Sequence, residues 1–388
     1  MKVLQVVPSL ALRHGGVSVS VRELCRGLAS LGTEVEVWST PRGYEPAVDE
    51  PEDERLRKTG VRVRYFPVSR LPWAGRNYAY SPSLGRALRQ ESRRFDLLHL
   101  HSLWLYPTLA AASAGRRLKI PYLLSPCGAL DPYSLSVRRA LKRLYLLAAE
   151  RRNLQGASAV HFTSEMELRR ADTFGVHFRE AVIPRSLELG QIPDVPPARR
   201  SEWDGRKILL FLGRLHPKKR LDLATAAFAD LCKQRNDVHF VIAGPDEGSA
   251  ATARRIAENA GILDRVTFLG LTEPRQRWAL FKSASLFLLP SEDENFGMAA
   301  LEAMAVEVPV LLSDQVGLSQ EVSEAKAGLV LDGEIASWSG AARLLLEHPE
   351  IAEQMGRAGR KLVETKFSTR RVASRMNELY GSLLVRRS

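Results

Sequence analysis

Two glutamates and the loop between them are the residues of this chain best suited to chemistry. The stretch SEDENFGMAALEAMA, residues 291–305, places Glu294 in a loop and Glu302 in the apolar helix that follows, with seven residues between them. The two carboxylates can contact one ligand from different levels along the helix axis, one from the loop and one from the helix. Because carboxylates accept hydroxyl donors, the pair suits a polyhydroxylated ligand such as a sugar or ribose. The alternative is a helix start at which Glu292, Asp293 and Glu294 only complement the helix dipole and cap N–H groups.

The same loop offers backbone donors. Gly297 permits a tight bend, and the N–H groups of Phe296, Gly297 and Met298 are expected to point toward the ligand, as N–H groups at a helix start do. The loop and the helix together therefore predict one end of a ligand site.

A cationic segment precedes another predicted helix. FLGRLHPKKRLD, residues 211–222, follows a strand end and a glycine turn with four cations, Arg214, Lys218, Lys219 and Arg220. Cations at the start of a helix oppose its dipole, so helix stability does not explain them. An anionic ligand does, because Arg offers a fork to phosphate oxygens and Lys a point charge, and together they could stabilise a diphosphate leaving group. A solvated basic loop is the alternative.

A pair of glycines follows the first predicted strand. RHGGVS, residues 13–18, contains Gly15 and Gly16, which let the backbone approach a ligand, and the next helix start suits a phosphate. The motif is not GxGxxG, so a plain tight turn explains it equally well. Further strand-end turns, AGPDEG at residues 243–248 and Gly270, are expected to face the same site or to be turns only.

These motifs lie between predicted strands and helices, because apolar runs alternate regularly with helical patterns along the chain. Such runs predict parallel strands buried on both faces, and they lie at Val3–Val7, Val35–Trp38, Val61–Phe66, Leu97–Leu100, Tyr122–Leu124, Ala159–Phe162, Ile208–Leu212, Phe240–Ala243, Val266–Leu269, Leu286–Leu289 and Val310–Leu312. One helix is predicted from Val17 to Leu31. The pattern indicates an α/β protein with two doubly wound, Rossmann-like domains and a binding site between them.

The domain boundaries follow from composition and length. A chain of 388 residues exceeds the ~250–300 at which one core stops growing. The Pro- and Gly-rich stretch GQIPDVPPARRSEWDG indicates a linker. We therefore predict an N-terminal Rossmann-like domain at 1–190, a linker at 191–205, a C-terminal Rossmann-like domain at 206–365, and a C-terminal helix at 366–388.

Composition and charge narrow the class of partner. Apolar residues make up 45% and charged residues 26%, as in soluble globular proteins, and no apolar run is long enough for a membrane span. Three scattered cysteines suit a reducing cytoplasm and show no metal-ligand spacing. Residues 1–190 hold 29 of the basic and 18 of the acidic residues, which leaves 27 and 26 for the rest. A basic first half favours an anionic glycan or membrane surface; without a nucleic-acid-binding motif, nucleic acid is not expected.

The motifs, in their order, resemble those of a known family. A Gly-Gly loop, a GRLxxxK segment and two glutamates around FG look like the retaining glycosyltransferases of family 4, which have the GT-B fold. The resemblance runs over nearly the whole chain, from MKVLQVVPSL and GGVSVSVRELCRGLASLG through SPCGALDPYSL and ENFGMAALEAMA to SDQVG. It implies transfer from a nucleoside diphosphate sugar, of UDP or GDP type, with retained anomeric configuration and no tightly bound cofactor or metal. It also implies that the domain at 1–190 binds the acceptor, that the domain at 206–365 binds the nucleotide sugar, and that the helix at 366–388 crosses back to the first domain.

The resemblance also implies roles for individual residues. Gly16 would lie against the donor diphosphate, which Arg214 and Lys219 would neutralise. Glu302 would hold the ribose hydroxyls, and Glu294 would contact the transferred sugar. The catalytic residues implied are Glu294, Arg214 and Lys219. Donor binding is expected from Gly15, Gly16, Arg214, Lys219, Gly270, Glu294, Asn295, Phe296, Gly297, Met298 and Glu302, and acceptor-side contacts from His101, Cys127 and Gly128.

The chain departs from the family pattern at three positions. Cys127 in SPCG stands where many relatives carry His, and because a thiol is a poor hydrogen-bond donor, a 6-deoxy or otherwise altered donor sugar is conceivable. Arg185 in PRS replaces the usual PNG asparagine and adds a cation. Glu307 replaces a glycine after the EAMA helix, where a left-handed residue is favoured, so strain or a changed turn is expected.

A basic amphipathic segment bears on the location of the protein. SVRRALKRLYLLAAERRNLQ, residues 136–155, combines arginines and a lysine with leucines. Such a helix could lie on an anionic membrane and reach a lipid-linked acceptor, or its leucines could simply enter the core. We expect a cytoplasmic protein and leave open peripheral attachment to the inner face of a membrane.

The sequence thus predicts a glycosyltransferase of the hexosyltransferase type that builds surface polysaccharide or glycolipid on a glycan or lipid-linked acceptor. Two alternatives stay open. One is a GT-B epimerase or phosphorylase, and the other is a nucleotide-sugar-binding protein that has lost catalysis.

Overall fold

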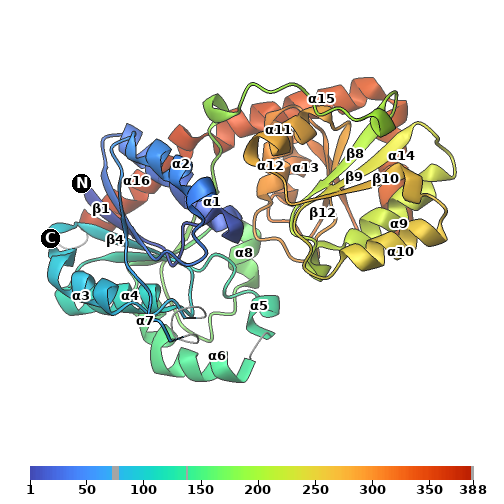
Figure 1. Ribbon diagram of the computed structural model, residues 1–388. Coiled ribbons are helices and arrows are strands. Elements are labelled where there is room, and N and C mark those ends of the chain that lie inside the picture. The colour runs from blue at the N-terminus through green and yellow to red at the C-terminus, as the bar shows by residue number, and fades with distance from the viewer. Residues whose placement is uncertain (72–77, 137–138, 386–388) are drawn as a thin grey trace. The chain divides into compact units, whose positions relative to one another are not determined.

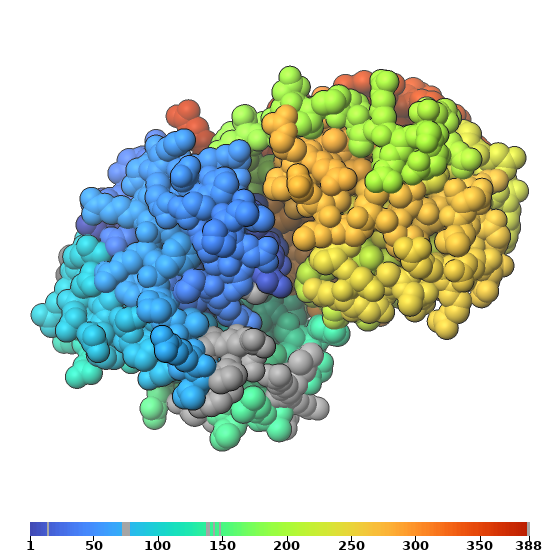
Figure 2. All heavy atoms as spheres, in the orientation of Figure 1, coloured from blue at the N-terminus to red at the C-terminus, as the bar shows by residue number. Residues whose placement is uncertain are grey.

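A computed structural model of the chain describes residues 1–71, 78–136 and 139–385. It divides into two compact units. Unit 1 comprises Met1–Ser186 with Phe367–Ser388, and unit 2 comprises Leu187–Lys366. Each unit is a parallel β-sheet covered by helices (Figure 1), and side chains close over the sheet of each unit on the face that Figure 2 shows.

The sheet of unit 1 has seven parallel strands in the order β3-β2-β1-β4-β5-β6-β7. This order reverses direction between β1 and β4, which is the topological switch point of a doubly wound sheet. The strands are β1 Lys2–Val6, β2 Glu34–Ser39, β3 Arg62–Tyr65, β4 Leu97–His101, β5 Tyr122–Ser125, β6 Ala159–Phe162 and β7 Glu180–Val182.

Both faces of this sheet are buried, as the continuous apolar runs predict. Val3 and Val35 belong to one core cluster together with residues of α1 and α16, whereas Leu4 and Leu98 belong to the opposite cluster with residues of α3 and α4. Neighbouring residues of a strand point to opposite faces, so each run fills two cores at once. The helices of unit 1 are α1 Gly16–Ser30, α2 Pro46–Arg57, α3 Pro82–Glu91, α4 Tyr106–Leu118, α5 Pro132–Ser136, α6 Arg139–Tyr145, α7 Arg151–Gln155, α8 Glu165–Arg170 and α16 Thr369–Val385.

The last helix, α16, packs on α1 within unit 1 (Figure 1). A Cβ at Gly27 would come within 2.7 Å of the Ala373 Cβ, so glycine at this position lets the two helices approach closely. Tyr380 of α16 is fully buried and reaches the polar centre of the sheet, where its hydroxyl accepts from the Gln5 side-chain amide at 3.1 Å. The C-terminal segment is therefore part of the unit 1 core.

Three buried histidines join this network. The Nδ1 of His99 lies 2.7 Å from the Tyr380 hydroxyl, and its Nε2 lies 2.7 Å from the Ser125 hydroxyl, which also contacts Nδ1 of His161. His101 Nε2 lies 2.8 Å from the Gln5 side-chain oxygen. Burial holds the pKa of His99 well below its usual value and lowers the pKa of His101 to about 3 and that of His161 to about 4. All three rings are therefore neutral at pH 7.

These histidines make stability fall as the solution is acidified. In the unfolded chain each titrates near 6.5, so below that pH the unfolded state binds protons that the folded state refuses. From pH 7.5 to 5.5 each neutral histidine should cost roughly 1.3 kcal/mol of unfolding free energy, and the loss continues toward pH 4. Urea titrations at the two pH values measure the difference. His161→Gln should reduce it by roughly that amount, and an unchanged pH dependence in the variant would contradict the assignment.

Unit 2 repeats the architecture with six parallel strands in the order β10-β9-β8-β11-β12-β13. Its strands are β8 Lys207–Leu212, β9 Val238–Ala243, β10 Val266–Gly270, β11 Leu286–Leu289, β12 Val310–Ser313 and β13 Gly328–Leu331. Helices α9 and α14 pack together on one face (Figure 1), and α12 packs with α15. The helices are α9 Leu221–Cys232, α10 Ala250–Asn259, α11 Pro274–Ser283, α12 Met298–Ala305, α13 Ser319–Ala325, α14 Ile335–Glu347 and α15 Pro349–Leu362.

The Pro-rich stretch before β8 lies on unit 2. The Ala198 N–H donates to the Ala279 carbonyl at 3.0 Å, and the Lys282 ammonium donates to the Val195 carbonyl at 2.9 Å. Trp203 is buried. Residues 191–205 therefore combine the composition of a linker with ordered contacts to one unit.

The turn after α12 is left-handed, as the usual glycine at this position suggests. Glu307 has φ of 64°, its N–H donates to the Met304 carbonyl, and the Val308 N–H donates to the Ala303 carbonyl. A side chain at this conformation is strained, which glycine avoids. Glu307→Gly should therefore raise the unfolding free energy by roughly 1 kcal/mol. The same change at Glu347, the last helical residue of α14, should lower the unfolding free energy by about 1 kcal/mol. Thermal or urea unfolding should therefore show that Glu307→Gly stabilises the protein and that Glu347→Gly destabilises it.

Candidate active site

Three loops at the carboxyl ends of unit 2 strands are tied together by backbone hydrogen bonds. The Glu292 N–H donates to the Lys218 carbonyl at 2.8 Å. Glu294 pairs with the loop after β12, because its N–H donates to the Gln315 carbonyl at 3.3 Å and its carbonyl accepts from the Gly317 N–H at 2.8 Å. The GRLHPKK, DENFG and SDQVG motifs therefore form one assembly around Glu294.

The centre of this assembly is an ion pair between Lys219 and Glu294. The Lys219 ammonium contacts Glu294 Oε2, and the two side chains are 11% and 22% exposed. Lys219 ends a short 3-10 helix, Pro217–Lys219, and the left-handed Arg220 (φ 50°) turns the chain into α9. The structure thus brings together two of the three predicted catalytic residues, with a cation and a carboxylate held side by side.

Glu302 lies in the second turn of α12 and is almost fully buried. Its Oε2 contacts the guanidinium of Arg277 on α11. Burial raises the pKa of Glu302, which Arg277 opposes. Arg277 was not predicted from the sequence, because nothing in LTEPRQRW marks it, and its Nε is a buried donor without a protein acceptor. An arginine therefore fixes the orientation of the carboxylate expected to bind ribose.

The acids before α12 do not cap this helix. Its N-cap is Gly297, with φ of 102° and no side-chain cap, and its first turn contains no acid. Asp293 instead lies 3.9 Å from the Lys218 ammonium, and Glu292 lies 3.9 Å from the Arg220 guanidinium. The capping interpretation was therefore wrong for these side chains, which balance the neighbouring cations.

Gly297 is required by its conformation and by its neighbours. A Cβ there would lie 2.9 Å from Cγ1 of Val316, in addition to the strain of a positive φ. The Phe296 ring is buried, so this residue offers only its backbone to a ligand. Asn295 and Met298 flank the bend and are partly exposed.

Arg214 forms an ion pair of its own. Its guanidinium is 2.7 Å from Glu247, and both side chains are exposed to solvent. The Gly244 turn beside it cannot carry a side chain, because a Cβ would lie 1.8 Å from the Gly213 carbonyl oxygen. Gly270, with φ of 68°, ends β10 and accepts from the Gly244 N–H at 2.7 Å. The two glycine turns thus support each other.

In unit 1 the predicted phosphate loop leads directly into a helix. Gly16 is the first residue of α1, and Gly15 is its N-cap with φ of 79°. The buried Arg22 guanidinium holds the preceding loop in place, because it donates to the Leu10 carbonyl and lies 2.7 Å from buried Asp53. A buried ion pair therefore fixes the approach to the glycines.

The predicted acceptor-side residues follow β4 and β5 of unit 1. His101 ends β4 and is buried. Cys127 and Gly128 follow β5 with φ of 54° and 79°, and the Gly128 N–H donates to Glu167 at 2.7 Å. Burial raises the pKa of Cys127 to about 11, against the influence of Arg185, so its thiol is neutral.

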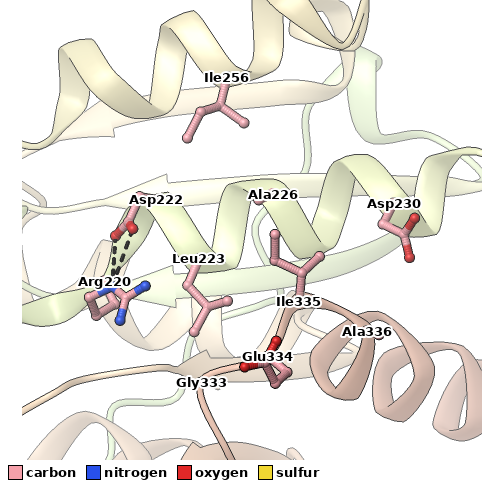
Figure 3. Close-up of a pocket in the computed structure, with 10 residues that line it drawn as sticks. All are labelled: Arg220, Asp222, Leu223, Ala226, Asp230, Ile256, Gly333, Glu334, Ile335 and Ala336. Atoms are coloured by element: carbon pink, nitrogen blue, oxygen red, sulfur yellow. Dashed lines mark hydrogen bonds and ion pairs between the residues drawn. The ribbon is translucent and has the colours of Figure 1, made fainter.

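One hollow of unit 2 lies elsewhere and contains none of the predicted site residues (Figure 3). It has a volume of ≈ 520 Å³ and lies between α9, α10 and the start of α14. Its cation Arg220 is turned toward Asp222, with 3.2 Å between Nε and the carboxylate (Figure 3). Asp230 and Glu334 add two more carboxylates to the lining. A diphosphate would be repelled there, so we do not assign this hollow to the donor.

The basic segment at 136–155 forms α6, a π-helical turn at Leu146–Glu150, and α7. Arg138 lies outside the described residues. Leu141 and Leu144 of α6 are 60% and 67% exposed, whereas Leu146 and Leu154 are buried. Two of the leucines therefore face solvent rather than the core.

The residues that the structure describes contain neither a metal-binding cluster nor a membrane-spanning helix. No group of three or more His, Cys, Asp or Glu side chains there is arranged to hold a metal ion. No helix within 1–71, 78–136 and 139–385 is long and apolar enough to cross a membrane.

Sequence comparisons match both halves of the chain. The model described as glycosyl transferases group 1 matches residues 198–362, and the glycosyl transferase 4-like domain matches residues 15–185. The chain is 28% identical over 364 residues to a D-inositol 3-phosphate glycosyltransferase of Nocardia farcinica, covering 88% of this chain and 79% of that protein. The enzyme of the same name from Corynebacterium glutamicum is 25% identical, over 95% and 92%.

Solved structures share the fold. The sucrose-phosphate synthase of Thermosynechococcus elongatus superposes with a TM-score of 0.72 at 22% identity, over 99% of both chains. HepE of Anabaena, solved with UDP and glucose, gives 0.74 at 16% identity, over 98% of this chain and 100% of that one. The expected GT-B fold is thereby confirmed. The chain belongs to the group 1 glycosyl transferases with a glycosyl transferase 4-like N-terminal part, the family 4 type that its motifs resemble.

Proposed function

We propose that this glycosyltransferase is a retaining enzyme that takes a sugar from a nucleoside diphosphate sugar of UDP or GDP type. The acceptor is a glycan or lipid-linked glycan in cytoplasmic polysaccharide or glycolipid synthesis. The observation that carries the proposal is the Lys219–Glu294 ion pair in loops joined by backbone hydrogen bonds. Among the proposed donor-binding residues, Gly15 and Gly16 belong to unit 1 and the others to unit 2, whereas all the proposed acceptor-side residues belong to unit 1.

The geometry of unit 2 supports distinct tasks for its charged groups. Lys219, with little exposure, is a strong partner for a phosphate oxygen because burial weakens solvent screening. Glu294 beside it can accept hydroxyls of the transferred sugar, and Glu302, oriented by Arg277, can accept those of the ribose. Arg214 adds a second, exposed cation for the diphosphate.

In the proposed reaction the bond between the anomeric carbon and the diphosphate oxygen breaks, and its electron pair goes to the departing phosphate. An acceptor hydroxyl oxygen bonds to the same face of that carbon and passes its proton to the departing phosphate. Lys219 and Arg214 would stabilise the growing negative charge, which is the usual source of catalytic effect for such groups. The two glutamates are not a glycosidase pair, because neither needs to act as nucleophile or general acid.

Thermal unfolding against UDP, GDP, ADP and dTDP sugars tests donor binding. A ligand at ~100 times its dissociation constant adds ~2.7 kcal/mol of stability, so one base should raise the melting temperature clearly. A response to none of the four would count against the proposal. Turnover of the responding donor then excludes the alternative of a binding protein without catalysis, and net transfer rather than isomerisation or phosphorolysis excludes the epimerase and phosphorylase.

A phosphorylated small acceptor is the second candidate. The two relatives named above, both called D-inositol 3-phosphate glycosyltransferase, match this chain over 79% and 92% of their own length, which favours a test of the same acceptor class. Transfer assays with phosphorylated and unphosphorylated acceptors separate the two candidates.

For the lipid-linked candidate we propose that α6 docks on an anionic membrane. Exposed Leu141 and Leu144 provide apolar contacts, and Arg151 and Arg152 on α7 provide exposed positive charge. Flotation with anionic liposomes should therefore depend on salt and be lost in Leu141→Gln/Leu144→Gln. Leu344→Gln, at an exposed leucine of unit 2, is the matched control. Equal flotation of the double variant and the control would contradict docking by α6.

A further inference from the structure

A small, largely apolar cavity lies in unit 1, at the carboxyl ends of β4 to β7. Its volume is ≈ 40 Å³, which is room for a few water molecules or one small polar group. The wall is made by α1, α16 and the strand ends, and it contains no carboxylate. Its lining residues are Val17, Ser20, Val21, Leu24, His101, Ser125, Cys127, His161, Thr163, Pro184, Arg185, Ser186, Val372 and Met376.

Arg185 is the cation of this cavity, and its charge is not balanced by an ion pair with any carboxylate of the described residues. One guanidinium NH donates to the Ser20 hydroxyl at 2.9 Å. Its Nε is buried and has no acceptor in the protein. A buried donor of a charged group without a partner is expensive, so such groups are normally paired with another group or with a ligand. The arrangement leaves part of a planar fork available to an oxyanion.

The surrounding groups make the cavity attractive to an anion. His101 and His161 are neutral through burial, and Arg185 further lowers the pKa of both. Arg375 of α16 is a second nearby cation that acts on His161. Glu167 of α8 accepts from the Gly128 and Thr163 N–H groups and from the Thr163 hydroxyl. Its oxygens are therefore engaged by these donors and not by the Arg185 guanidinium.

We propose that Arg185 and this cavity form a binding subsite for a substrate phosphate group, separate from the Lys219 group of unit 2. The guanidinium supplies a charged fork, which matches phosphate oxygens well, and the Ser20 hydroxyl lies beside it. The histidine rings of the lining and the Ser125 and Thr163 hydroxyls are bonded to other protein groups, so the guanidinium carries the recognition. The assignment of this phosphate to a substrate rests on the proposed function, whereas phosphate binding by the subsite does not.

Inorganic phosphate added to the full chain is the probe. At constant ionic strength set by chloride, phosphate should raise the melting temperature by at least about 2 °C, as expected for a gain near 1 kcal/mol in a domain of this size. Arg185→Gln should abolish this shift. Arg179→Gln is the matched control, because Arg179 is also half-buried in unit 1, donates to a serine hydroxyl and has a buried nitrogen without an acceptor. It should keep the shift.

Lys219→Ala separates this subsite from the donor group. The phosphate shift should survive in Lys219→Ala, which removes the candidate donor contact. If Lys219→Ala loses the shift and Arg185→Gln keeps it, phosphate binds in unit 2 and the proposal is wrong. The absence of any shift in the wild-type chain would also overturn it. If Arg185→Gln does not fold, Arg185→Lys serves as the second variant, because it keeps the charge but not the planar fork. The phosphate concentration that gives half of the maximal melting-temperature shift should then rise about tenfold.

Kinetics then identify the source of the phosphate. If Arg185→Gln raises KM only for a phosphorylated acceptor, the subsite binds the acceptor's phosphate. If the variant raises KM only for the donor, the subsite binds the donor's diphosphate. Unchanged KM values for both would overturn the assignment to a substrate. A chain that fails to bind any nucleotide sugar but still shows the Arg185-dependent shift would refute the proposed function alone.

Discussion

Lys219→Ala should lower kcat/KM for sugar transfer by about 10²- to 10³-fold, a loss of ~2–4 kcal/mol of transition-state stabilisation. Lys219 is the least exposed cation of the site, and the charge it faces increases as the diphosphate departs. Removing it also leaves Glu294 without its ion-pair partner. Lys233→Ala, at the exposed end of α9, is the control and should transfer at near wild-type rate.

Glu294→Ala should abolish transfer while most of the nucleotide affinity remains, since the carboxylate is assigned to the sugar and not to the nucleotide. Because Lys219 and Glu294 touch, the double variant should lose less than the sum of the single losses. Steady-state kinetics with nucleotide titrations measure both effects. Near wild-type transfer by Glu294→Ala, or full additivity in the double variant, would contradict the roles given to the pair.

The second large effect is on stability. Asp53→Ala should lower the unfolding free energy by about 3–5 kcal/mol, because it leaves the fully buried Arg22 guanidinium unpaired. Asp53 also accepts from the Tyr65 hydroxyl at 2.7 Å, which then loses its acceptor. Urea unfolding measures the loss. Glu50→Ala, which breaks an exposed pair with Arg57 on the same helix, should have a much smaller effect.

A double replacement tests the physical reason. Arg22→Met/Asp53→Leu removes both charges, and because paired apolar groups replace a buried ion pair with little net cost, it should recover part of the lost stability. If Asp53→Ala is as stable as the wild-type chain, the ion pair does not hold the loop before Gly15. Equal stability of the single and the double variants would show that unpaired charge is not the cause of the loss.

The sheets were predictable from sequence because their central strands are buried on both faces. All eleven apolar runs became strands, with ends shifted by at most two residues. Two strands were missed, Glu180–Val182 and Gly328–Leu331. Both lie at sheet edges and are short and partly exposed, so they lack the continuous apolar pattern. The order of the strands could not be derived from their periodicity, since register and pairing depend on tertiary packing.

The sequence could predict which charged residues belong to the candidate site, but it could not predict which of them pair with each other. Sequence indicated that Lys219 and Glu294 serve one ligand, yet they are 75 positions apart and their contact depends on the loops around them. Arg277 was missed because an arginine on a helix face is usually a surface residue. The capping interpretation of Asp293 failed because α12 begins only after Gly297, four positions beyond Asp293, and its first turn contains no acid.

The anomeric configuration of the product tests the central claim most directly. NMR of the product formed from the responding nucleotide sugar would show the coupling constant of the anomeric proton, before and after transfer. The proposed same-face attack, with Lys219 stabilising the departing phosphate, predicts the configuration of the donor. A product with the opposite configuration would contradict a retaining mechanism and the roles given to the Lys219–Glu294 pair.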